Sequence, residues 1–312
     1  MSPDREPNTE PGLRSPEPGY RSGFAVLIGR PGVGKSTLVN RLVGQKVAIT
    51  AAVPQITRTR LSGILTLPHA QIVFVDTPGL HRPRHRLGEW MVEQSVRALR
   101  DADVVLLVLD AGDGVTPEDR AAIARLGGVR APALAVLNKI DRLPPGEMGA
   151  RLAAIGGLHA FAGVVPVSGL TGANLDELVQ VITGLLPEGP QYFPPEMVTD
   201  QPEQALVREL IREAAIKATR EELPYGIAVE IEEFTRREGK DLLYIRAILH
   251  VERDAHKKML IGKDGRMLRA IGQRARGDIE TLLHSRIYLD LWVKTSKGWR
   301  EREELIKAFY PE

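Results

Sequence analysis

The glycine-rich segment Gly29–Ser36 constrains the fold more than any other part of this 312-residue chain. It matches the pattern G-x-x-x-x-G-K-[ST] and directly follows the apolar run 24–28. A buried strand that enters a glycine-rich turn and then a helix directs backbone N–H groups and the positive helix end at a phosphate. We therefore predict a site for a nucleoside triphosphate rather than a glycine turn without a ligand. The predicted phosphate-binding residues are Gly29, Arg30, Pro31, Gly32, Val33, Gly34, Lys35, Ser36 and Thr37, with Lys35 at the β- and γ-phosphates and Ser36 on Mg²⁺.

Short apolar runs recur along the first part of the chain, separated by helix-like or loop segments. Most of them are almost continuously apolar, as strands covered on both faces are, whereas 61–67 alternates and suits an edge strand. The alternation predicts right-handed crossovers in a doubly wound, mostly parallel α/β domain, with its ligand at the carboxyl ends of the strands. The predicted strands cover 24–28, 61–67, 72–75, 104–109, 134–137 and 164–167, and the predicted helices cover 36–42, 87–99, 119–126 and 175–186.

A proline-rich stretch divides the chain, and we place a linker there at 187–199. Beyond it the apolar spacing predicts the order α-β-β-α-α-β, which is that of a separate α+β domain. Its first helix is expected to begin at a capping box formed by Asp200 and Glu203 and to stop before Pro224 and Gly226. The predicted divisions are a disordered tail at 1–20, the α/β domain at 21–186, the linker at 187–199, and the α+β domain at 200–312, which includes a C-terminal helix.

Composition limits the compartment and the chemistry. The chain has no cysteine, which excludes disulfides and thiolate metal sites and fits a reducing interior. The first 20 residues hold five prolines and no apolar core of a signal peptide. No apolar run approaches the roughly 20 residues of a membrane-spanning helix. We therefore expect a soluble cytoplasmic protein, and a peripheral contact with the cytoplasmic face of the cell membrane stays open.

The residues that select the base follow the run 134–137 as Asn138-Lys139-Ile140-Asp141. A carboxylate at Asp141 can accept hydrogen bonds from both N1–H and the 2-amino group of guanine. The Asn138 amide would meet the N7/O6 edge, and the Lys139 stem would cover the base. Adenine lacks those donors and would leave a buried carboxylate unpaired, so discrimination of roughly 10⁴–10⁵ is expected. Ser168 and Gly169 follow the last predicted strand and would offer a main-chain N–H to guanine O6. We therefore predict that 138–141 binds the base of GTP and is not an ordinary turn without a ligand.

A further phosphate-facing segment, Asp76-Thr77-Pro78-Gly79, follows the run 72–75. We expect Asp76 to hold Mg²⁺ through water and the Gly79 N–H to sense the γ-phosphate. His81 and His85 lie close by as candidates for a general base. Exposed switch-loop histidines are the better interpretation, because phosphoryl transfer depends mainly on positioning and electrostatics.

Residues 253–276 form the most basic stretch, with eight Lys and Arg against two Asp, a local charge of +6. Within it, Gly262-Lys263-Asp264-Gly265 supplies G-x-x-G between two predicted helices, as in a KH domain of type II topology, rather than a plain helix-joining turn. Glycines there let the backbone approach a sugar–phosphate chain, and about four unpaired bases would lie between the helix 266–282 and an edge strand. Aromatic residues are few, so we expect recognition through base edges and backbone. The predicted RNA-binding residues are Lys257, Lys258, Ile261, Gly262, Lys263, Asp264, Gly265, Arg266 and Arg269.

Together these segments make the chain resemble the bacterial Era family, which belongs to the translation-factor-related GTPases. The resemblance spans roughly residues 20–310. It implies an α/β P-loop GTPase domain followed by a type II KH domain. It also implies a switch I segment in which Thr57 completes the Mg²⁺ coordination begun by Ser36 and Asp76. The matching segments include 29–36, 55–58, 76–81, 138–141, 223–225, 257–265 and 291–294, and switch I comprises Gln55, Ile56, Thr57, Arg58 and Thr59.

Three residues depart from the family pattern, and a fourth, Leu80, matches the family but differs from Ras-like proteins. Leu80 stands where Ras-like proteins have the glutamine that orients the attacking water, so the resemblance implies slow hydrolysis with water positioned by another group. Gly32 occupies a place where many relatives have an asparagine linked to a monovalent cation, which leaves potassium stimulation open. Ile56 replaces a threonine, and Gly169 stands where alanine is usual.

The resemblance implies a function and a set of partners. We expect a Mg²⁺-dependent GTPase that alternates between GTP and GDP, binds single-stranded RNA near the 3′ end of small-subunit ribosomal RNA, and assists assembly of the 30S subunit. Switch loops at about 50–60 and 77–95 would change how the first domain packs on the second. A monomer is expected. One alternative is a membrane-peripheral switch that signals growth or cell-cycle state, and another is the GTPase subunit of a base-modifying enzyme, which the lack of cysteine disfavours.

Overall fold

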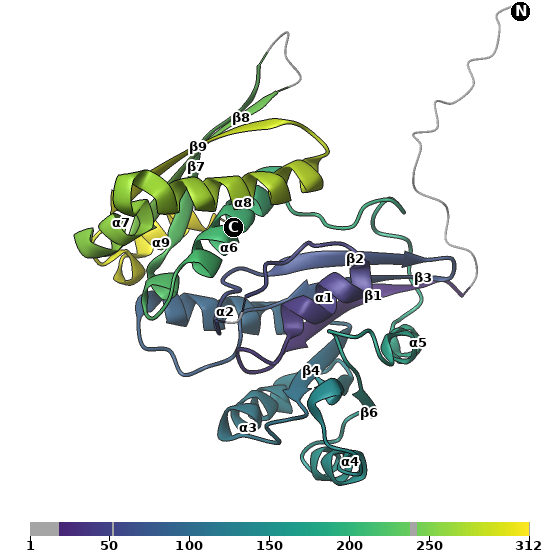
Figure 1. Ribbon diagram of the computed structural model, residues 1–312. Helices are drawn as coiled ribbons and strands as arrows, with labels where there is room; N and C mark the ends of the chain where they lie inside the picture. The colour runs from purple at the N-terminus through teal and green to yellow at the C-terminus, as the bar shows by residue number, and fades with distance from the viewer. Residues whose placement is uncertain (1–18, 52, 238–241, 312) are drawn as a thin grey trace, which may run out of the picture.

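The computed structural model describes residues 19–51, 53–237 and 242–311, so most of the predicted N-terminal tail lies outside it. Figure 1 shows an α/β body, coloured purple to teal, and an α+β body, coloured green to yellow, that lies above it. The elements of the first body are β1 (Arg21–Ile28), α1 (Lys35–Val43), β2 (Leu61–Leu67), β3 (Ala70–Asp76), α2 (Arg86–Arg100), β4 (Val104–Asp110), α3 (Pro117–Ala124), β5 (Ala133–Asn138), α4 (Met148–Gly156), β6 (Gly163–Pro166) and α5 (Leu175–Leu185).

The first body is built on a six-stranded sheet of order β2-β3-β1-β4-β5-β6. Only β2 runs antiparallel to its neighbour, and the other pairs are parallel. This arrangement confirms the predicted mostly parallel α/β domain, and it confirms that the alternating run 61–67 is an edge strand. Since β1 lies at the centre of the order, the glycine-rich loop that follows it leaves the sheet at its middle.

Helices cover both faces of this sheet, which explains the continuously apolar strands. In β1, Ala25 and Leu27 join one buried cluster, while Val26 and Ile28 join the other. Residues of α1 and α5 fill the first cluster, and residues of α2, α3 and α4 fill the second. A strand with helices on both sides has no face left for polar side chains.

The second body has a three-stranded sheet of order β7-β8-β9, in which β7 and β8 are antiparallel and β8 and β9 are parallel. The helices α6 and α8 pack on one face of this sheet in a single hydrophobic core. The observed order α-β-β-α-α-β confirms the predicted KH topology. The elements are α6 (Glu203–Ala218), β7 (Ala228–Arg236), β8 (Leu243–Val251), α7 (Asp254–Ile261), α8 (Arg266–Leu283), β9 (Ile287–Thr295) and α9 (Glu303–Phe309).

Some local predictions were wrong. The capping box at Asp200 and Glu203 does not form, because α6 begins at Glu203 directly after Pro202, without a side-chain cap. The same helix ends at Ala218, well before the 3₁₀ turn Leu223–Gly226 that contains the expected stop residues. The helix α4 was not predicted, because its alanine- and glycine-rich sequence has only one buried apolar residue to mark a face.

The segment predicted as a linker lies along the sheet of the first body. Ile64 donates its N–H to Val198 O at 2.8 Å, at the edge of the sheet. The Oε1 of Gln71 accepts the N–H groups of Tyr192 and Phe193 at 2.8 and 2.9 Å. These bonds fix the path of the chain between the two bodies, so the connection is held to the first body over much of its length.

A buried aromatic cluster joins the two bodies. Trp299, which is fully buried, donates its indole N–H to Gly226 O at 2.9 Å and packs near Phe309 and Tyr310. The same cluster includes Leu87 and Met91 of α2, which belong to the first body. Burial of apolar area across this boundary stabilises the observed domain arrangement.

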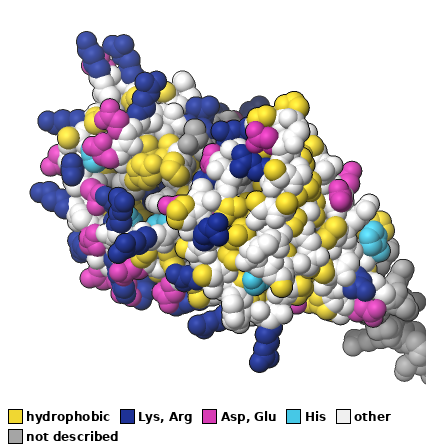
Figure 2. Space-filling view, turned by 90° about the horizontal axis from the view of Figure 1, so that it is seen from below, with side chains coloured by type: hydrophobic (Ala, Val, Ile, Leu, Met, Phe, Trp, Pro, Cys, Tyr) yellow, Lys and Arg dark blue, Asp and Glu magenta, His cyan; other side chains and the backbone are white. Residues whose placement is uncertain are grey.

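The surface mixes charges of both signs. On the face drawn in Figure 2, Lys and Arg side chains are interspersed with Asp and Glu, so this face has no large patch of one sign. Several exposed charges pair along one helix, such as Arg97–Glu93 of α2 at 2.9 Å. Within the described ranges, no helix is both long and apolar enough to cross a lipid bilayer.

We expect Trp299→Ala to lower the free energy of unfolding by about 3–5 kcal/mol, because it empties a fully buried aromatic position and leaves Gly226 O without its donor. Urea unfolding of the full chain measures this change. The matched control is Trp292→Ala, since Trp292 is 60% exposed and its loss should change stability by less than about 0.5 kcal/mol. Equal destabilisation by the two substitutions would contradict the role of Trp299 in the interdomain core.

Candidate functional site

A cavity of about 310 Å³ opens at the carboxyl ends of the central strands of the first body. Its position agrees with the site predicted for a doubly wound sheet. Most of the glycine-rich loop lines it, together with the loop that precedes β2. The lining residues are Pro31, Gly32, Gly34, Lys35, Ser36, Thr37, Ile49, Thr50, Ala51, Val53, Pro54, Gln55, Ile56, Thr57, Gly79 and Lys139.

Three residues of the predicted phosphate-binding set do not line this cavity. Val33 belongs to the hydrophobic core. Arg30 turns toward α3 and pairs with Asp113 at 2.5 Å. Gly29 takes part through its carbonyl oxygen, which accepts hydrogen bonds from Lys35 and from the Leu80 N–H.

Lys35 is held inside the glycine-rich loop. Its Nζ donates to Gly29 O at 3.1 Å and to Arg30 O at 3.2 Å, and the residue is 6% exposed. Burial lowers the pKa of Lys35 to about 8, although the nearby Asp76 carboxylate acts in the opposite direction. The loop conformation depends on Gly34, which has φ +95°, and a Cβ there would lie 2.6 Å from Asn138 Nδ2.

Side-chain oxygens from three separate segments converge beside Lys35. Ser36 Oγ lies 2.5 Å from Asp76 Oδ2 and 2.9 Å from Thr57 Oγ1. Thr57 Oγ1 is also 3.4 Å from Asp76 Oδ2. These are the three residues predicted to hold Mg²⁺, and the structure brings them together.

The chemistry of this cluster suits a hard cation. Asp76 is fully buried, its Oδ1 has no hydrogen-bond partner, and burial raises the pKa of its carboxyl group. A divalent ion would satisfy that oxygen, and hydroxyl and carboxylate oxygens are ligands that Mg²⁺ accepts. Among the described residues, no group of three or more His, Cys, Asp or Glu could hold a metal. A metal in this region would therefore be bound by these few oxygens and by the phosphates of a ligand.

The segment after β3 approaches the glycine-rich loop closely. A Cβ at Gly79 would lie 2.6 Å from the backbone nitrogen of Pro31, so only glycine fits without displacing the loop. The next residue, Leu80, is 6% exposed and packs in the hydrophobic core. Its side chain therefore faces away from the cavity and cannot orient a water molecule there.

The two nearby histidines have structural partners. The Nδ1 of His81 lies 2.8 Å from Gly79 O, and the Nδ1 of His85 accepts the N–H of Gly88 at 2.9 Å as the N-cap of α2. Burial lowers the pKa of His85, which keeps its ring neutral and able to accept that bond. Both residues are half-buried rather than exposed as predicted.

The predicted base-binding residues gather at the ends of β5 and β6. Asn138 is 2% exposed; its Nδ2 donates to Val33 O at 2.9 Å and its Oδ1 accepts the Gly169 N–H at 2.9 Å. This amide therefore ties the phosphate loop to the loop after β6. Lys139 has φ +65°, and its Nζ contacts Gly32 O at 2.6 Å and Asp110 Oδ2 at 2.7 Å, which stretches its stem along the cavity.

Asp141 is oriented by a neighbouring hydroxyl. Ser168 Oγ donates to Asp141 Oδ1 at 2.5 Å and accepts the Thr171 N–H at 3.1 Å. The main-chain N–H of Ser168 donates to Ala173 O at 3.1 Å, and that of Gly169 donates to Asn138. The predicted contact of one of these N–H groups with guanine O6 would therefore require an exchange of hydrogen bonds, and it stays a prediction.

The segment around Thr57 is shared between the two bodies. Ile56 packs against Ile216 of α6, and its carbonyl oxygen accepts a hydrogen bond from Arg212 at 2.6 Å. Arg58 is 3% exposed and donates to Ile227 O at 2.6 Å. It was predicted as part of the nucleotide-facing switch segment, but its side chain points into the second body. Sequence patterns gave no signal for this direction.

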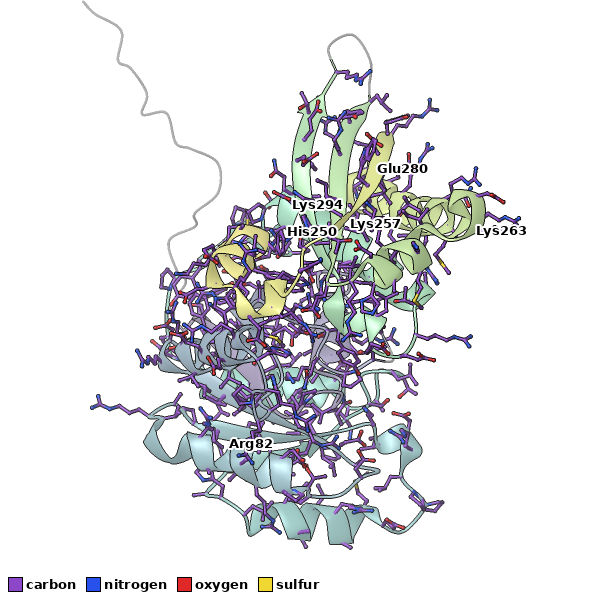
Figure 3. All side chains as sticks on the ribbon, turned by 90° about the vertical axis from the view of Figure 1, so that its left-hand side faces the viewer. Arg82, His250, Lys257, Lys263, Glu280 and Lys294 are labelled. Carbon is purple, nitrogen blue, oxygen red and sulfur yellow. The ribbon has the colours of Figure 1, made fainter. Side chains whose placement is uncertain are left out.

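A second hollow of about 520 Å³ lies on the KH body between α8 and β9, as predicted for the RNA groove. The G-x-x-G loop is at one end, where Arg269 donates to Asp264 O at 2.5 Å. Figure 3 shows Lys263 of this loop projecting into solvent at the outer tip of the KH body. The lining residues are Asp264, Gly265, Leu268, Arg269, Gly272, Gln273, Arg276, Tyr288, Leu289 and Leu291.

The groove includes only part of the predicted RNA-binding set. Asp264, Gly265 and Arg269 line it, while Ile261 packs against the KH core and Lys257 is half-buried on α7. The remaining predicted residues, Lys258, Gly262, Lys263 and Arg266, surround the loop end without lining the hollow. The wall formed by Tyr288 and its neighbours in β9 was missed, because strand alternation marks a face but not a groove.

The depressed pKa of Lys35 predicts a pH dependence of nucleotide binding. A polyphosphate stabilises the ammonium form, so affinity should be nearly constant well below pH 8 and fall as the pH rises through that value. We expect about fourfold weaker GDP binding at pH 8.5 than at pH 7, measured by calorimetry. Lys35→Arg is the control, because its guanidinium stays charged in this range and its affinity should not vary. A wild-type affinity that is flat between the two pH values would contradict the prediction.

Comparison with known proteins agrees with both halves of the molecule. A family model described as 50S ribosome-binding GTPase matches residues 24–139, and one described as KH domain matches residues 222–300. The GTPase Era of Halothermothrix orenii is 48% identical over 288 residues, which covers 92% of this chain and 97% of the relative. The GTPase Era of Alkaliphilus oremlandii is 44% identical over 289 residues and covers 93% and 98%.

Solved structures give the same result. A structure of Era in complex with MgGDPNP and nucleotides 1506–1542 of 16S ribosomal RNA superimposes with a TM-score of 0.91 at 40% identity. The match covers 93% of this chain and 99% of the other. A variant of Aquifex aeolicus Era bound to GDP and AlF₄⁻ matches with a TM-score of 0.89. Because these similarities extend over nearly the whole length of both partners, the chain belongs to the Era family of GTPases.

Proposed function

We propose that the chain binds GTP with Mg²⁺ in the 310 Å³ cavity, hydrolyses it slowly, and uses the nucleotide state to control RNA binding by the KH body. The RNA is single-stranded sequence near the 3′ end of small-subunit ribosomal RNA, and the process served is maturation of the 30S subunit. The observation that carries this proposal is the shared segment 56–58. Thr57 faces the nucleotide cavity, while Ile56 and Arg58 are bound by the second body.

The nucleotide part rests on the lining of the cavity. Lys35 and the backbone of the glycine-rich loop would hold the phosphates, with the positive end of α1 behind them. Asp141, oriented by Ser168, would accept hydrogen bonds from guanine N1–H and the 2-amino group. A carboxylate held in one orientation discriminates between bases better than a freely rotating one.

The metal and the rate follow from the same residues. Ser36, Thr57 and Asp76 would surround Mg²⁺, which neutralises charge on the phosphates as hydrolysis proceeds. Buried Leu80 leaves no side chain at the place of the Ras-like glutamine, so intrinsic hydrolysis is expected to be slow. A bound partner or another backbone group would then position the water.

The RNA part rests on the groove and on the relatives. The related Era structure holds GDPNP together with nucleotides 1506–1542 of 16S ribosomal RNA. Its fold matches this chain over both bodies, and the groove here has the G-x-x-G loop and exposed arginines that a sugar–phosphate chain requires. The membrane-peripheral alternative gains no support from these relatives or from the residues that the structure describes.

Guanine recognition is tested by Asp141→Asn. The amide would present a donor where guanine N1–H needs an acceptor, so GTP affinity should fall at least 10³-fold. Xanthine has an acceptor at that edge, so xanthosine triphosphate should bind the variant better than it binds the wild type. Competition with a fluorescent nucleotide measures both affinities. Unchanged GTP binding by the variant would contradict the assignment of Asp141.

Coupling is tested by Arg58→Ala in the full chain. We expect wild-type protein to bind the RNA of nucleotides 1506–1542 about tenfold tighter with a non-hydrolysable GTP analogue than with GDP, a coupling of about 1.4 kcal/mol. Loss of the Arg58 side chain should reduce this difference, because switch I is then held to the KH body only through the contacts of Ile56 with α6. Fluorescence anisotropy measures all four binding constants.

The matched control for this test is Arg60→Ala. Arg60 lies two residues further along and is exposed, so its loss removes the same charge without breaking the buried contacts. It should retain the difference between the two nucleotide states. Equal RNA affinity of the wild-type protein in both states would overturn the proposed coupling.

A further inference from the structure

An aromatic side chain lies at the end of the RNA groove that is far from the G-x-x-G loop. The groove runs along α8 from Gly265 to Arg276, and β9 forms its other wall. The chain turns back between the end of α8 at Leu283 and the start of β9 at Ile287, so the helix and strand run in opposite directions. Tyr288, the second residue of β9, therefore lies at the end of the groove that is far from the loop.

Tyr288 has one ring face against the protein and one ring face open. It is paired across the sheet with Tyr244 of β8, and their rings stack with centroids 5.6 Å apart and planes 9° from parallel. Tyr244 is 6% exposed, whereas Tyr288 is 57% exposed. By strand alternation Tyr288 lies on the sheet face away from α8, because its neighbours Ile287 and Leu289 pack in the core with that helix. Since β9 is the edge strand, the second ring face of Tyr288 is open past that edge, where the residue lines the rim of the groove.

The support behind Tyr288 is rigid. The guanidinium groups of Arg237 and Arg246 lie 4.8 and 5.6 Å from the centroid of the Tyr244 ring. The Tyr244 hydroxyl donates to Asp290 Oδ2 at 3.2 Å, and Arg246 Nε donates to the same oxygen at 3.2 Å. These contacts fix the inner ring, so the outer ring is presented with little loss of conformational entropy on binding.

A carboxylate joins the two walls of the groove beside Tyr288. Glu280, labelled in Figure 3, accepts the Ile287 N–H at 3.1 Å and the Arg276 Nε–H at 3.0 Å. The first bond ties α8 to the start of β9. The second places the Arg276 side chain, which is 55% exposed, at the same end of the groove as Tyr288. A flat apolar surface and a cation thus lie next to each other, as binding of one nucleotide requires.

We propose that Tyr288 stacks on one RNA base directly beyond the four nucleotides that a KH groove holds, with Arg276 at the adjoining phosphate. The inference rests on the proposed RNA-binding function and extends it by one nucleotide. It differs from the expectation, drawn from the few aromatic residues, that recognition relies on base edges and backbone. Because every base has a flat π surface, this position should contribute affinity with little sequence preference.

The test uses the full chain, the GTP analogue and the RNA of nucleotides 1506–1542, together with a series of this RNA in which one base at a time is removed to leave an abasic sugar. Tyr288→Ala should weaken binding of the intact RNA about tenfold. At a single position of the series, the abasic RNA should bind wild type and variant equally. Tyr288→Phe retains the ring and should retain wild-type affinity, and Tyr288→Leu, which retains apolar bulk, should lose affinity as alanine does.

Control variants separate this inference from the function on which it rests. Gly265→Asp places a carboxylate at the loop and should weaken every RNA of the series. A Cβ there meets no atom within 4 Å, and aspartate tolerates the left-handed φ of +73° better than most residues do. Trp292→Ala removes another exposed aromatic of β9 that lies outside the groove, and it should bind like wild type. Thermal melting checks that each variant is folded.

Two outcomes would overturn the stacking role while leaving RNA binding intact. One is binding by Tyr288→Ala within twofold of wild type while Gly265→Asp binds poorly. The other is a loss of RNA affinity in Tyr288→Ala that does not identify one stacked base. That loss would have the same size for every abasic RNA, or the same size as the loss in Trp292→Ala. If Gly265→Asp binds all RNAs like wild type, the proposed groove itself is wrong.

Discussion

The buried guanidinium of Arg58 is the interaction on which the relation between the two bodies depends. It is 3% exposed, and its hydrogen bonds go to Ile227 O, Tyr225 O and the Tyr310 hydroxyl rather than to a carboxylate. Burial lowers the pKa of Arg58, and removing a charge from water without a paired anion costs several kcal/mol unless its donors are satisfied. The ring of Trp299 at 5.4 Å adds a cation–π contact. Thr57 is the residue adjacent to Arg58. A movement of switch I that follows the γ-phosphate must therefore either move the KH body as well or break the hydrogen bonds of the buried Arg58 guanidinium.

The helix α6 makes the other contacts that hold switch I to the KH body, through a face that carries charged residues. Arg212 donates to Ile56 O and to Glu209 at 2.5 Å, and both side chains are buried. One turn later, Glu213 accepts the Thr50 N–H at 3.1 Å and pairs with Lys46 at 2.5 Å. Burial opposes ionisation of Glu209, but the adjacent arginines lower its pKa, so the pair stays charged. Breaking such a pair costs more than forming it gains, which makes the contact specific for one arrangement of the switch loop.

The sheet, the phosphate loop and the oxygen cluster of the site could be predicted from the sequence, whereas the contacts between the two bodies could not. The phosphate loop could be predicted from Gly29–Ser36 after an apolar run, because that pattern reflects local chain geometry. The sheet could be predicted from strands such as β4, which has no polar residue until Asp110, because burial on both faces requires apolar residues throughout. Convergence of Ser36, Thr57 and Asp76 was predicted through the family resemblance. The direction of Arg58 was not, because a polar residue in a loop gives no signal of which body will bury it. The charged face of α6 was missed for the same reason, since apolar spacing at Leu206, Leu210 and Ala214 marks only the face toward the KH core.

The position of the groove limits how the nucleotide can act on RNA. On α8, Arg269, Gly272 and Arg276 face the groove, whereas Asp278, which receives Lys46 of the first body at 3.2 Å, lies near the opposite side of the helix by its spacing of about 100° per residue. The residues between them, Ile271, Ala275 and Ile279, are fixed in the KH core, and a close-packed core transmits displacement rather than deforming. A nucleotide-driven change at switch I therefore reaches α8 as a movement of the whole KH body. The groove keeps its shape during such a movement. The nucleotide state would therefore change RNA affinity only where a longer RNA, or the particle that carries it, contacts both bodies at once.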